Sequence, residues 1–169
     1  MNRYQKILVA LDGGPESKRA LEEAIRVARL SQAHVRGLYV LDRAPAFPYT
    51  LHYDRALMEQ NFLREGRAVL DEAARTLADA GLTWDTTLIE TDGMTEDVPA
   101  CLLRCAEHYG ADLVVMGTHG RHGVKRAVLG SMAERFLRIS TCPVLLMRGE
   151  AVEAPATQPQ VQTPAASQP

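Results

Sequence analysis

The residues in this chain whose types and spacing best suit chemistry are a series of glycines that ends in a serine. They are Gly117, Gly120, Gly123, Gly130 and Ser131, and they follow a short apolar run. Because glycine has no Cβ, its backbone can adopt positive φ and approach a bound anion closely. The first turn of a helix adds N–H groups without partners and a partial positive charge. A strand, a glycine loop and then a helix therefore predict a phosphate-binding site.

The spacing of this loop is Gly117, two residues, Gly120, nine residues, Gly130 and then Ser131. It fits neither the Walker A motif, because no Lys follows Gly130, nor the GxGxxG dinucleotide motif. The loop resembles that of the ATP-binding members of the universal stress protein family, which have glycines at this spacing followed by Ser or Thr. The resemblance extends over about residues 4–148.

The elements that must position this loop alternate along the chain. Apolar runs predict strands over 5–12, 34–42, 83–90, 112–117 and 142–147, and apolar stripes predict helices over about 15–31, 55–80, 95–109 and 131–139. This alternation predicts an α/β fold with an open, mostly parallel sheet and helices on both faces. The resemblance implies a doubly wound, Rossmann-like sheet of five strands in the order 3-2-1-4-5, with the first and fourth strands side by side.

Asp12 is a polar residue at the end of the first predicted strand, and two glycines follow it. In sheets of this kind, ligands bind beyond the carboxyl ends of the strands, where the strand order reverses. The resemblance implies that Asp12 contacts the ribose or a phosphate-bound Mg²⁺, and a carboxylate suits that hard ion. The alternative is that Asp12 caps a turn or a helix. The family often has Ser where this chain has Gly14, which removes a possible hydroxyl contact.

The resemblance assigns further residues to parts of a nucleotide. Val40 matches the position at which the family binds adenine through main-chain groups, and Arg121 is one of several cationic side chains around the loop. The candidate binding residues are Ala10, Asp12, Val40, Met116, Gly117, Gly120, Arg121, Gly130, Ser131 and Met132, with Asp12 also the candidate Mg²⁺ ligand. The glycines and Ser131 would hold the ribose and phosphates through N–H groups and one hydroxyl.

The sequence shows no catalytic constellation. A hydrolase needs a group that activates water, and no Asp or Glu lies between Gly117 and Ser131, which leaves His119 as the only candidate base. His119 and His122 without a third ligand nearby are weak evidence for zinc. We therefore expect at most slow ATP hydrolysis. The favoured function is a regulatory protein that binds ATP and Mg²⁺ and changes its conformation or its affinity for a partner.

Two other functions remain open. One is a nucleotide alpha hydrolase, although such enzymes usually carry a glycine-serine loop after the first strand and a second domain, for which this chain has no room. The other is a stress protein that dimerises without nucleotide, although members without ATP usually lack the glycine pattern. A homodimer is expected in any case, because the apolar strand 142–147 would otherwise be an exposed edge and the resemblance implies that it pairs with its two-fold mate.

Length and composition fit one globular domain over 1–148, since 46% of the residues are hydrophobic and 24% are charged. The net charge of −2 offers no basic surface for nucleic acid. No apolar run reaches the roughly 20 residues that cross a bilayer. With three cysteines, an odd number, we expect a cytoplasmic protein. The tail 149–169, rich in Pro, Gln and Ala, is expected to be disordered, and 44–54 is expected to be an aromatic loop.

Overall fold

The computed structural model describes residues 4–43, 55–93, 95–120 and 129–149. Its elements are β1 (Lys6–Ala10), α1 (Pro15–Ser31), β2 (His34–Leu41), α2 (Arg55–Asp79), β3 (Trp84–Glu90), α3 (Val98–Tyr109), β4 (Leu113–Gly117), α4 (Ser131–Ile139) and β5 (Val144–Met147). The strands form one sheet in the order β3-β2-β1-β4-β5, and every pair is parallel. The predicted fold and strand order are confirmed. The expected loop 44–54 and the tail beyond Gly149 lie outside the described residues.

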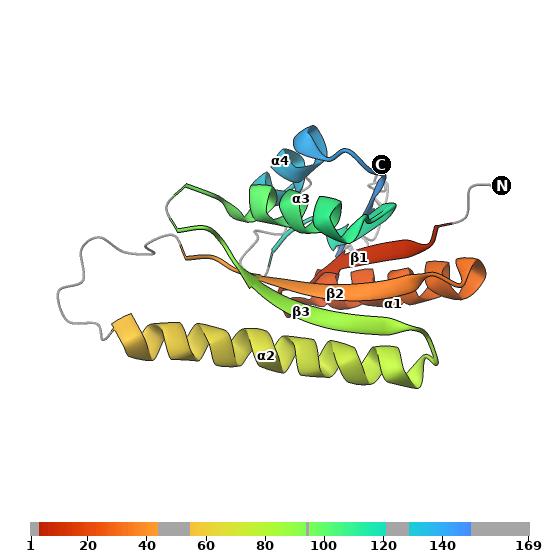
Figure 1. The fold of residues 1–169 in the computed structure, drawn as a ribbon, viewed down its shortest axis with the longest axis horizontal. Coiled ribbons are helices and arrows are strands. Elements are labelled where there is room, and N and C mark those ends of the chain that lie inside the picture. The colour runs from red at the N-terminus through yellow and green to blue at the C-terminus, as the bar shows by residue number, and fades with distance from the viewer. Residues whose placement is uncertain (1–3, 44–54, 94, 121–128, 150–169) are drawn as a thin grey trace, which may run out of the picture.

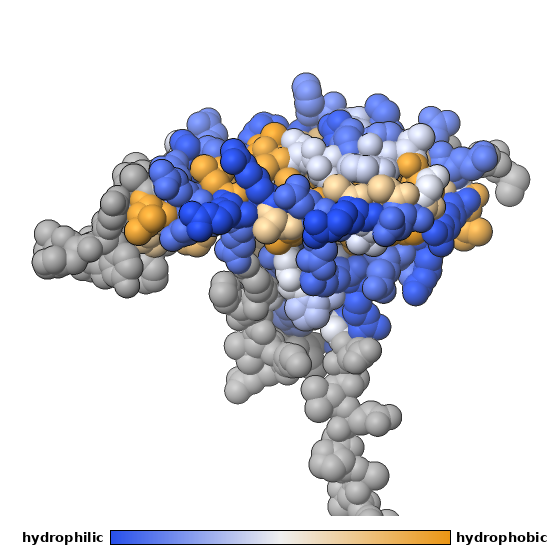
Figure 2. Space-filling model, turned by 90° about the horizontal axis from the view of Figure 1, so that it is seen from below, coloured by the Kyte–Doolittle hydropathy of each residue, from blue (hydrophilic) through white to orange (hydrophobic). Residues whose placement is uncertain are grey.

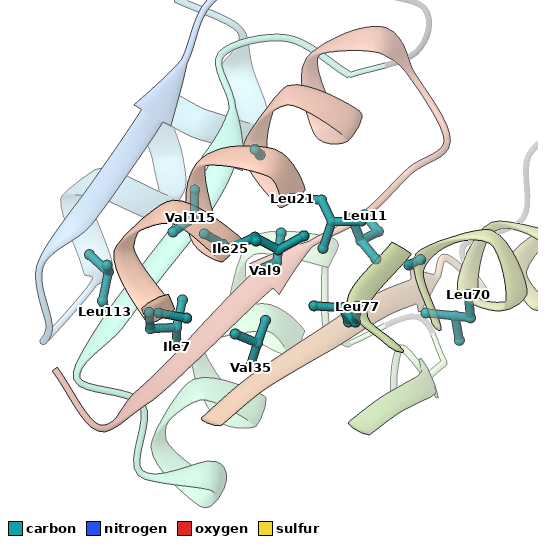
Figure 3. Packing of buried hydrophobic residues seen from close by; sticks show 14 of the residues in the cluster. Ile7, Val9, Leu11, Leu21, Ile25, Val35, Leu70, Leu77, Leu113 and Val115 are labelled. Carbon is teal, nitrogen blue, oxygen red and sulfur yellow. The ribbon is translucent and has the colours of Figure 1, made fainter. Parts of the chain in front are cut away.

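The helices form two layers, with α1 and α2 on one face of the sheet and α3 and α4 on the other (Figure 1). Two hydrophobic clusters fill the space between these layers and the sheet. Successive residues of β1 alternate between them, because side chains of a strand point to opposite faces. Ile7 and Val9 belong to the cluster under α1 and α2, which Figure 3 shows, while Leu8 belongs to the cluster under α3 and α4.

The centre of the sheet is buried on both faces. Ile7, Leu8 and Val9 of β1 are fully buried, as are Val114 and Val115 of β4. A strand covered on both sides needs apolar residues throughout, which is why these runs do not alternate with polar residues. The face seen from the side of α2 is mostly hydrophilic, with hydrophobic side chains scattered among the polar ones (Figure 2). Among the described residues, none of the helices combines the length and apolar character needed to span a bilayer.

The element boundaries differ from the predicted ones by two or more residues in three places, at the start of α3, at the end of β1 and at the start of β5, which is Val144 rather than residue 142. Helix α3 begins at Val98 rather than at residue 95, because the Asp97 side chain caps it by accepting a hydrogen bond of 3.0 Å from the Ala100 N–H. Thr95 instead lies in a turn in which its N–H donates to the Asp92 carbonyl. The predicted strand 5–12 is also shorter, since β1 ends at Ala10. Asp97, a short polar residue two positions before Pro99, is therefore the better signal for the helix start.

Polar contacts tie the amino ends of the strands together. The Arg36 guanidinium of β2 binds Asp85 of β3 through two hydrogen bonds of 2.6 and 2.8 Å. The same guanidinium lies over the Tyr109 ring at 4.2 Å from its centroid. The hydrogen bonds from Arg36 lower the pKa of Asp85, even though burial opposes them. This end of the sheet is closed by β2, β3 and the last turn of α3.

Gly66 lies inside α2, where glycine costs about 1 kcal/mol relative to Ala. A Cβ at this position would lie 2.8 Å from the Tyr39 ring and 2.9 Å from Leu88 Cδ1. The glycine therefore lets α2 pack closely on β2 and β3.

We expect Gly66→Ala to destabilise the protein, because overpacking costs about 1–3 kcal/mol and exceeds the helix-propensity gain of about 1 kcal/mol. Urea unfolding should show a net loss of about 1 kcal/mol. Arg67→Ala, at the neighbouring exposed position, is the control and should leave the unfolding midpoint nearly unchanged. Equal stability of the two variants would contradict the packing role of Gly66.

Candidate functional site

The candidate site lies at the carboxyl ends of β1 and β4, where the strand order reverses. β1 leads through α1 to β2 on one side, while β4 pairs with β1 on the other side. The chain beyond β1 and the chain beyond β4 meet here, since a Cβ at Gly120 would lie 3.5 Å from Asp12 Oδ2. Two segments about a hundred residues apart thus form one edge, as expected for a ligand site in a doubly wound sheet.

Asp12 is oriented by its own turn. Its Oδ1 accepts a hydrogen bond of 2.8 Å from the Gly14 N–H, and its own N–H donates to Ser17 Oγ at 3.4 Å. Gly13 has a φ of +82°, which a residue with a side chain rarely adopts. The alternative that Asp12 caps a turn is therefore true of the structure. It is compatible with a ligand role, because Oδ2 is the oxygen that lies toward Gly120.

The glycines of the loop allow close packing rather than positive φ. Gly117, Gly120 and Gly130 are absent from the glycines with positive φ in the described chain. At Gly130, a Cβ would lie 2.7 Å from the Thr118 carbonyl oxygen, and the Gly130 N–H donates to that oxygen at 2.9 Å. These three positions therefore do not use the positive φ that glycine allows. Gly130, which has no side chain, instead allows the start of α4 to contact the chain just after β4.

Helix α4 presents its N-terminus at this edge. Its N-cap residue, Gly130, has no side chain to accept the first N–H groups of the helix. Ser131 is exposed and Met132 is half-buried in the first turn. The N–H groups of a first turn have no partner within the helix and carry a partial positive charge. This arrangement can accept an anion through main-chain donors.

The remaining predicted residues fall into three groups. Ala10 and Val40 lie near the carboxyl ends of β1 and β2 and pack against the cluster under α3 and α4. Met116 belongs to the same cluster and is only 1% exposed, so its side chain is part of the core. Arg121 lies outside the described residues. The described residues contain no group of three or more His, Cys, Asp or Glu side chains that could hold a metal ion alone.

Glu16, which lies in the first turn of α1, is a further residue of this edge that was not predicted from the sequence. Its Oε2 accepts hydrogen bonds from the Thr118 hydroxyl at 2.9 Å and from the His119 N–H at 2.7 Å. Its Oε1 lies 3.3 Å from His119 Nδ1. An acidic residue in the first turn of a helix is usually explained by its favourable interaction with the helix dipole. Only the position of Glu16 at the same sheet edge as the glycine loop could have indicated its contacts with Thr118 and His119.

Comparisons with known proteins identify the family. The model of the universal stress protein family matches residues 3–148. The chain belongs to the universal stress protein family. A universal stress protein of Methanocaldococcus jannaschii is 33% identical over 148 residues, which are 87% of this chain and 84% of that protein.

Solved structures agree with this assignment. A universal stress protein family structure from Burkholderia pseudomallei is 38% identical, has a TM-score of 0.69 and covers 85% of this chain and 96% of its own. The Archaeoglobus fulgidus universal stress protein in complex with dAMP is 20% identical, has a TM-score of 0.61 and covers 86% of this chain and 99% of its own. The second likeness shows a shared fold.

We expect Gly130→Ala to destabilise the protein by about 2 kcal/mol, because the new methyl group would meet a main-chain carbonyl that cannot move aside easily. Gly120→Ala should change stability by less than about 0.5 kcal/mol, since its nearest atom is at ordinary contact distance. Thermal unfolding of both variants without ligand tests this difference. A larger loss for Gly120→Ala would mean that the loop packing is assigned to the wrong glycine.

Proposed function

We propose that this protein is a regulatory module that binds ATP together with Mg²⁺ at the carboxyl edge of its sheet. The observation that carries the proposal is the meeting of Asp12, Gly120 and the uncapped start of α4 at the reversal of strand order. Main-chain donors, a carboxylate and an open edge suit a polyphosphate and its metal ion. Structures of distant relatives with the same fold contain dAMP, cAMP and AMP, which supports an adenosine ligand.

Each residue then has a role that follows from its place. The first-turn N–H groups of α4, with the Ser131 hydroxyl, would hold phosphate oxygens, and Gly120 would leave room for them beside Asp12. Asp12 would hold Mg²⁺ together with water and phosphate oxygens, since Mg²⁺ is commonly bound through one or two carboxylates. Val40, near the carboxyl end of β2 and paired with Ile89 of β3, would contact adenine through its main chain.

The proposed mode of action is regulatory rather than catalytic. A ligand that binds one conformation better than another shifts the population toward it, and that shift can be read by a protein partner. His119 is the candidate base for slow hydrolysis, with Nδ1 at 3.1 Å from Thr118 Oγ1. We place the protein in the cytoplasm because its three cysteines are free, as in a reducing compartment.

We expect ATP with Mg²⁺ to stabilise the purified protein by about 2.7 kcal/mol at a hundred times its dissociation constant. Gly120→Val should abolish most of this effect, because its methyl groups would fill the space beside Asp12. Isothermal titration with ATP, ADP and AMP, with and without Mg²⁺, measures the dissociation constants of the wild type and of the variant. Thermal unfolding with and without the ligand measures the gain in stability. The unfolding midpoint of the free variant shows that it still folds.

Asp12→Asn keeps an oxygen for the Gly14 N–H and removes the charge, so it should weaken the dependence of ATP affinity on Mg²⁺. Asp79→Asn, at the last residue of α2, is the matched control and should behave as wild type. Absence of any binding at millimolar nucleotide would favour a stress protein that dimerises without nucleotide. Rapid release of ADP and phosphate would favour a hydrolase instead.

We also infer a homodimer formed through β5, which is an edge strand of the sheet. Its residues Val144, Leu145, Leu146 and Met147 are apolar and only half-buried. The Pro143 carbonyl accepts a hydrogen bond from Val114 of β4, and the Met147 carbonyl accepts one from Thr118, just beyond β4. Because main-chain groups alternate in direction along a strand, those of Val144 and Leu146 point away from β4. A second copy can pair with them.

We expect light scattering to show a dimer at micromolar concentration. Leu146→Pro should give a monomer, because it removes an outward N–H, and Pro is tolerated on edge strands. Leu146→Ala loses a similar amount of packing but keeps the N–H, so this control should remain dimeric. A monomeric wild type, or a dimeric Leu146→Pro variant that is folded by circular dichroism, would contradict pairing through β5.

A further inference from the structure

Glu16 joins three segments that are distant in sequence. It lies in the first turn of α1, and its side chain is only 15% exposed. Its carboxylate accepts the Thr118 hydroxyl and the His119 N–H just beyond β4, as well as the N–H of Gly149 just beyond β5. One carboxylate therefore holds the beginning of the glycine loop and the last described residue of the chain.

Two glycines make room for this side chain. A Cβ at Gly117 would lie 2.8 Å from Glu16 Cβ, and a Cβ at Gly149 would lie 3.0 Å from Glu16 Oε1. Neither glycine is among those with positive φ in the described chain, so neither is needed for an unusual backbone conformation. The approach of Glu16 thus accounts for a glycine at the first position of the loop motif.

The Glu16 carboxylate is charged at neutral pH. Burial raises the pKa of this carboxyl, but the hydrogen bonds from His119, Thr118 and Gly149 outweigh burial, and the pKa falls below its ordinary value. A carboxylate that accepts several N–H and O–H bonds makes stronger hydrogen bonds than a neutral group in the same place. The segments around it are therefore held by a charged acceptor.

We propose that Glu16 is a positioning residue for the nucleotide site, which fixes the Thr118–His119 backbone so that Gly120 and the start of α4 face the ligand. The inference rests on the proposed nucleotide-binding function, which it deepens. Glu16 acts through the loop, because its carboxylate is occupied by protein donors. The Thr118 carbonyl then bonds to Gly130, so the position that Glu16 sets is passed to the first turn of α4.

A second consequence is that the site and the chain end are coupled. The same carboxylate binds His119 in the loop and Gly149 after β5, and the Thr118 N–H donates to the Met147 carbonyl at 2.9 Å. A nucleotide that orders the loop therefore also stabilises the end of β5. Such coupling is reciprocal, so loosening the Gly149 contact weakens nucleotide binding.

The test combines isothermal titration with amide hydrogen exchange by NMR on the full-length protein. Glu16→Gln keeps the size of the side chain and removes its charge. We expect its ATP affinity with Mg²⁺ to fall about tenfold, and exchange at the His119 and Gly149 amides to become faster. Mg-ATP should slow exchange at Gly149 in the wild type but not in this variant.

Asp85→Asn is the matched control, since it also removes a half-buried carboxylate but at the amino ends of the strands. It should lose stability and keep wild-type affinity and exchange at Gly149, a separation that a merely structural role of Glu16 would not produce. Thr118→Val serves as a second variant if Glu16→Gln does not fold. It removes one donor to Glu16, and its affinity should fall by a smaller factor.

Each outcome decides the inference. Wild-type affinity and wild-type exchange in Glu16→Gln would overturn it, and tighter nucleotide binding would show that Glu16 repels phosphate instead of positioning the loop. If the wild type binds no nucleotide, the proposed function fails. In that case, comparing amide exchange at His119 and Gly149 between Glu16→Gln and the wild type still tests whether the carboxylate orders these segments. Equal exchange rates in the two proteins would overturn the positioning role of Glu16 as well.

Discussion

The close contact between the start of α4 and the exit of β4 is the constraint on which the carboxyl edge depends. It exists because Gly130 has no side chain where the Thr118 carbonyl approaches it, and a hydrogen bond of 2.9 Å closes the contact. This contact brings the N-terminus of a helix to the reversal of strand order. Without it, the partial positive charge of α4 would be displaced from the edge at which Asp12 lies.

The buried centre of the sheet fixes the position of the contact between the start of α4 and the end of β4. β1 and β4 are paired in register from Ile7 with Leu113 to Val9 with Val115, and helices cover both of their faces. Close-packed interiors deform little, so the chain leaves both strands at defined positions. The residues that follow the two strands, Asp12 and Gly120, then need only short turns to come together. The geometry of the site is thus a consequence of core packing several residues away.

Much of this was predictable from the sequence, for identifiable reasons. Helices 15–31 and 131–139 were placed at their observed bounds, because Pro15 and the Gly130–Ser131 pair mark their starts. The strand order came from a family resemblance, since periodicity alone does not say which strands are neighbours. The start of α3 was missed because its cap, Asp97, follows two polar residues that fit a helix equally well.

The site was predictable as a region but not in its internal contacts. The glycine spacing located the loop, yet it could not show that Gly117 accommodates Glu16 and that Gly130 accommodates a carbonyl. The first contact depends on a side chain about a hundred residues away and the second on the path of the loop back to β4, and no local pattern reports either. Met116 likewise looked like a residue at the site from its position, but the pleat of β4 turns its side chain into the core.

The amino and carboxyl ends of the strands are built from different kinds of contact. Charged and aromatic side chains of β2, β3 and α3 close the amino end, as Arg36, Asp85 and Tyr109 show, whereas turns with glycines form the carboxyl end beyond β1 and β4. Substitutions in the turns at the carboxyl end can therefore leave the contacts of Arg36, Asp85 and Tyr109 at the amino end in place. A chain with other residues at these turns would keep the same sheet and core and differ only at the edge where β1 and β4 end.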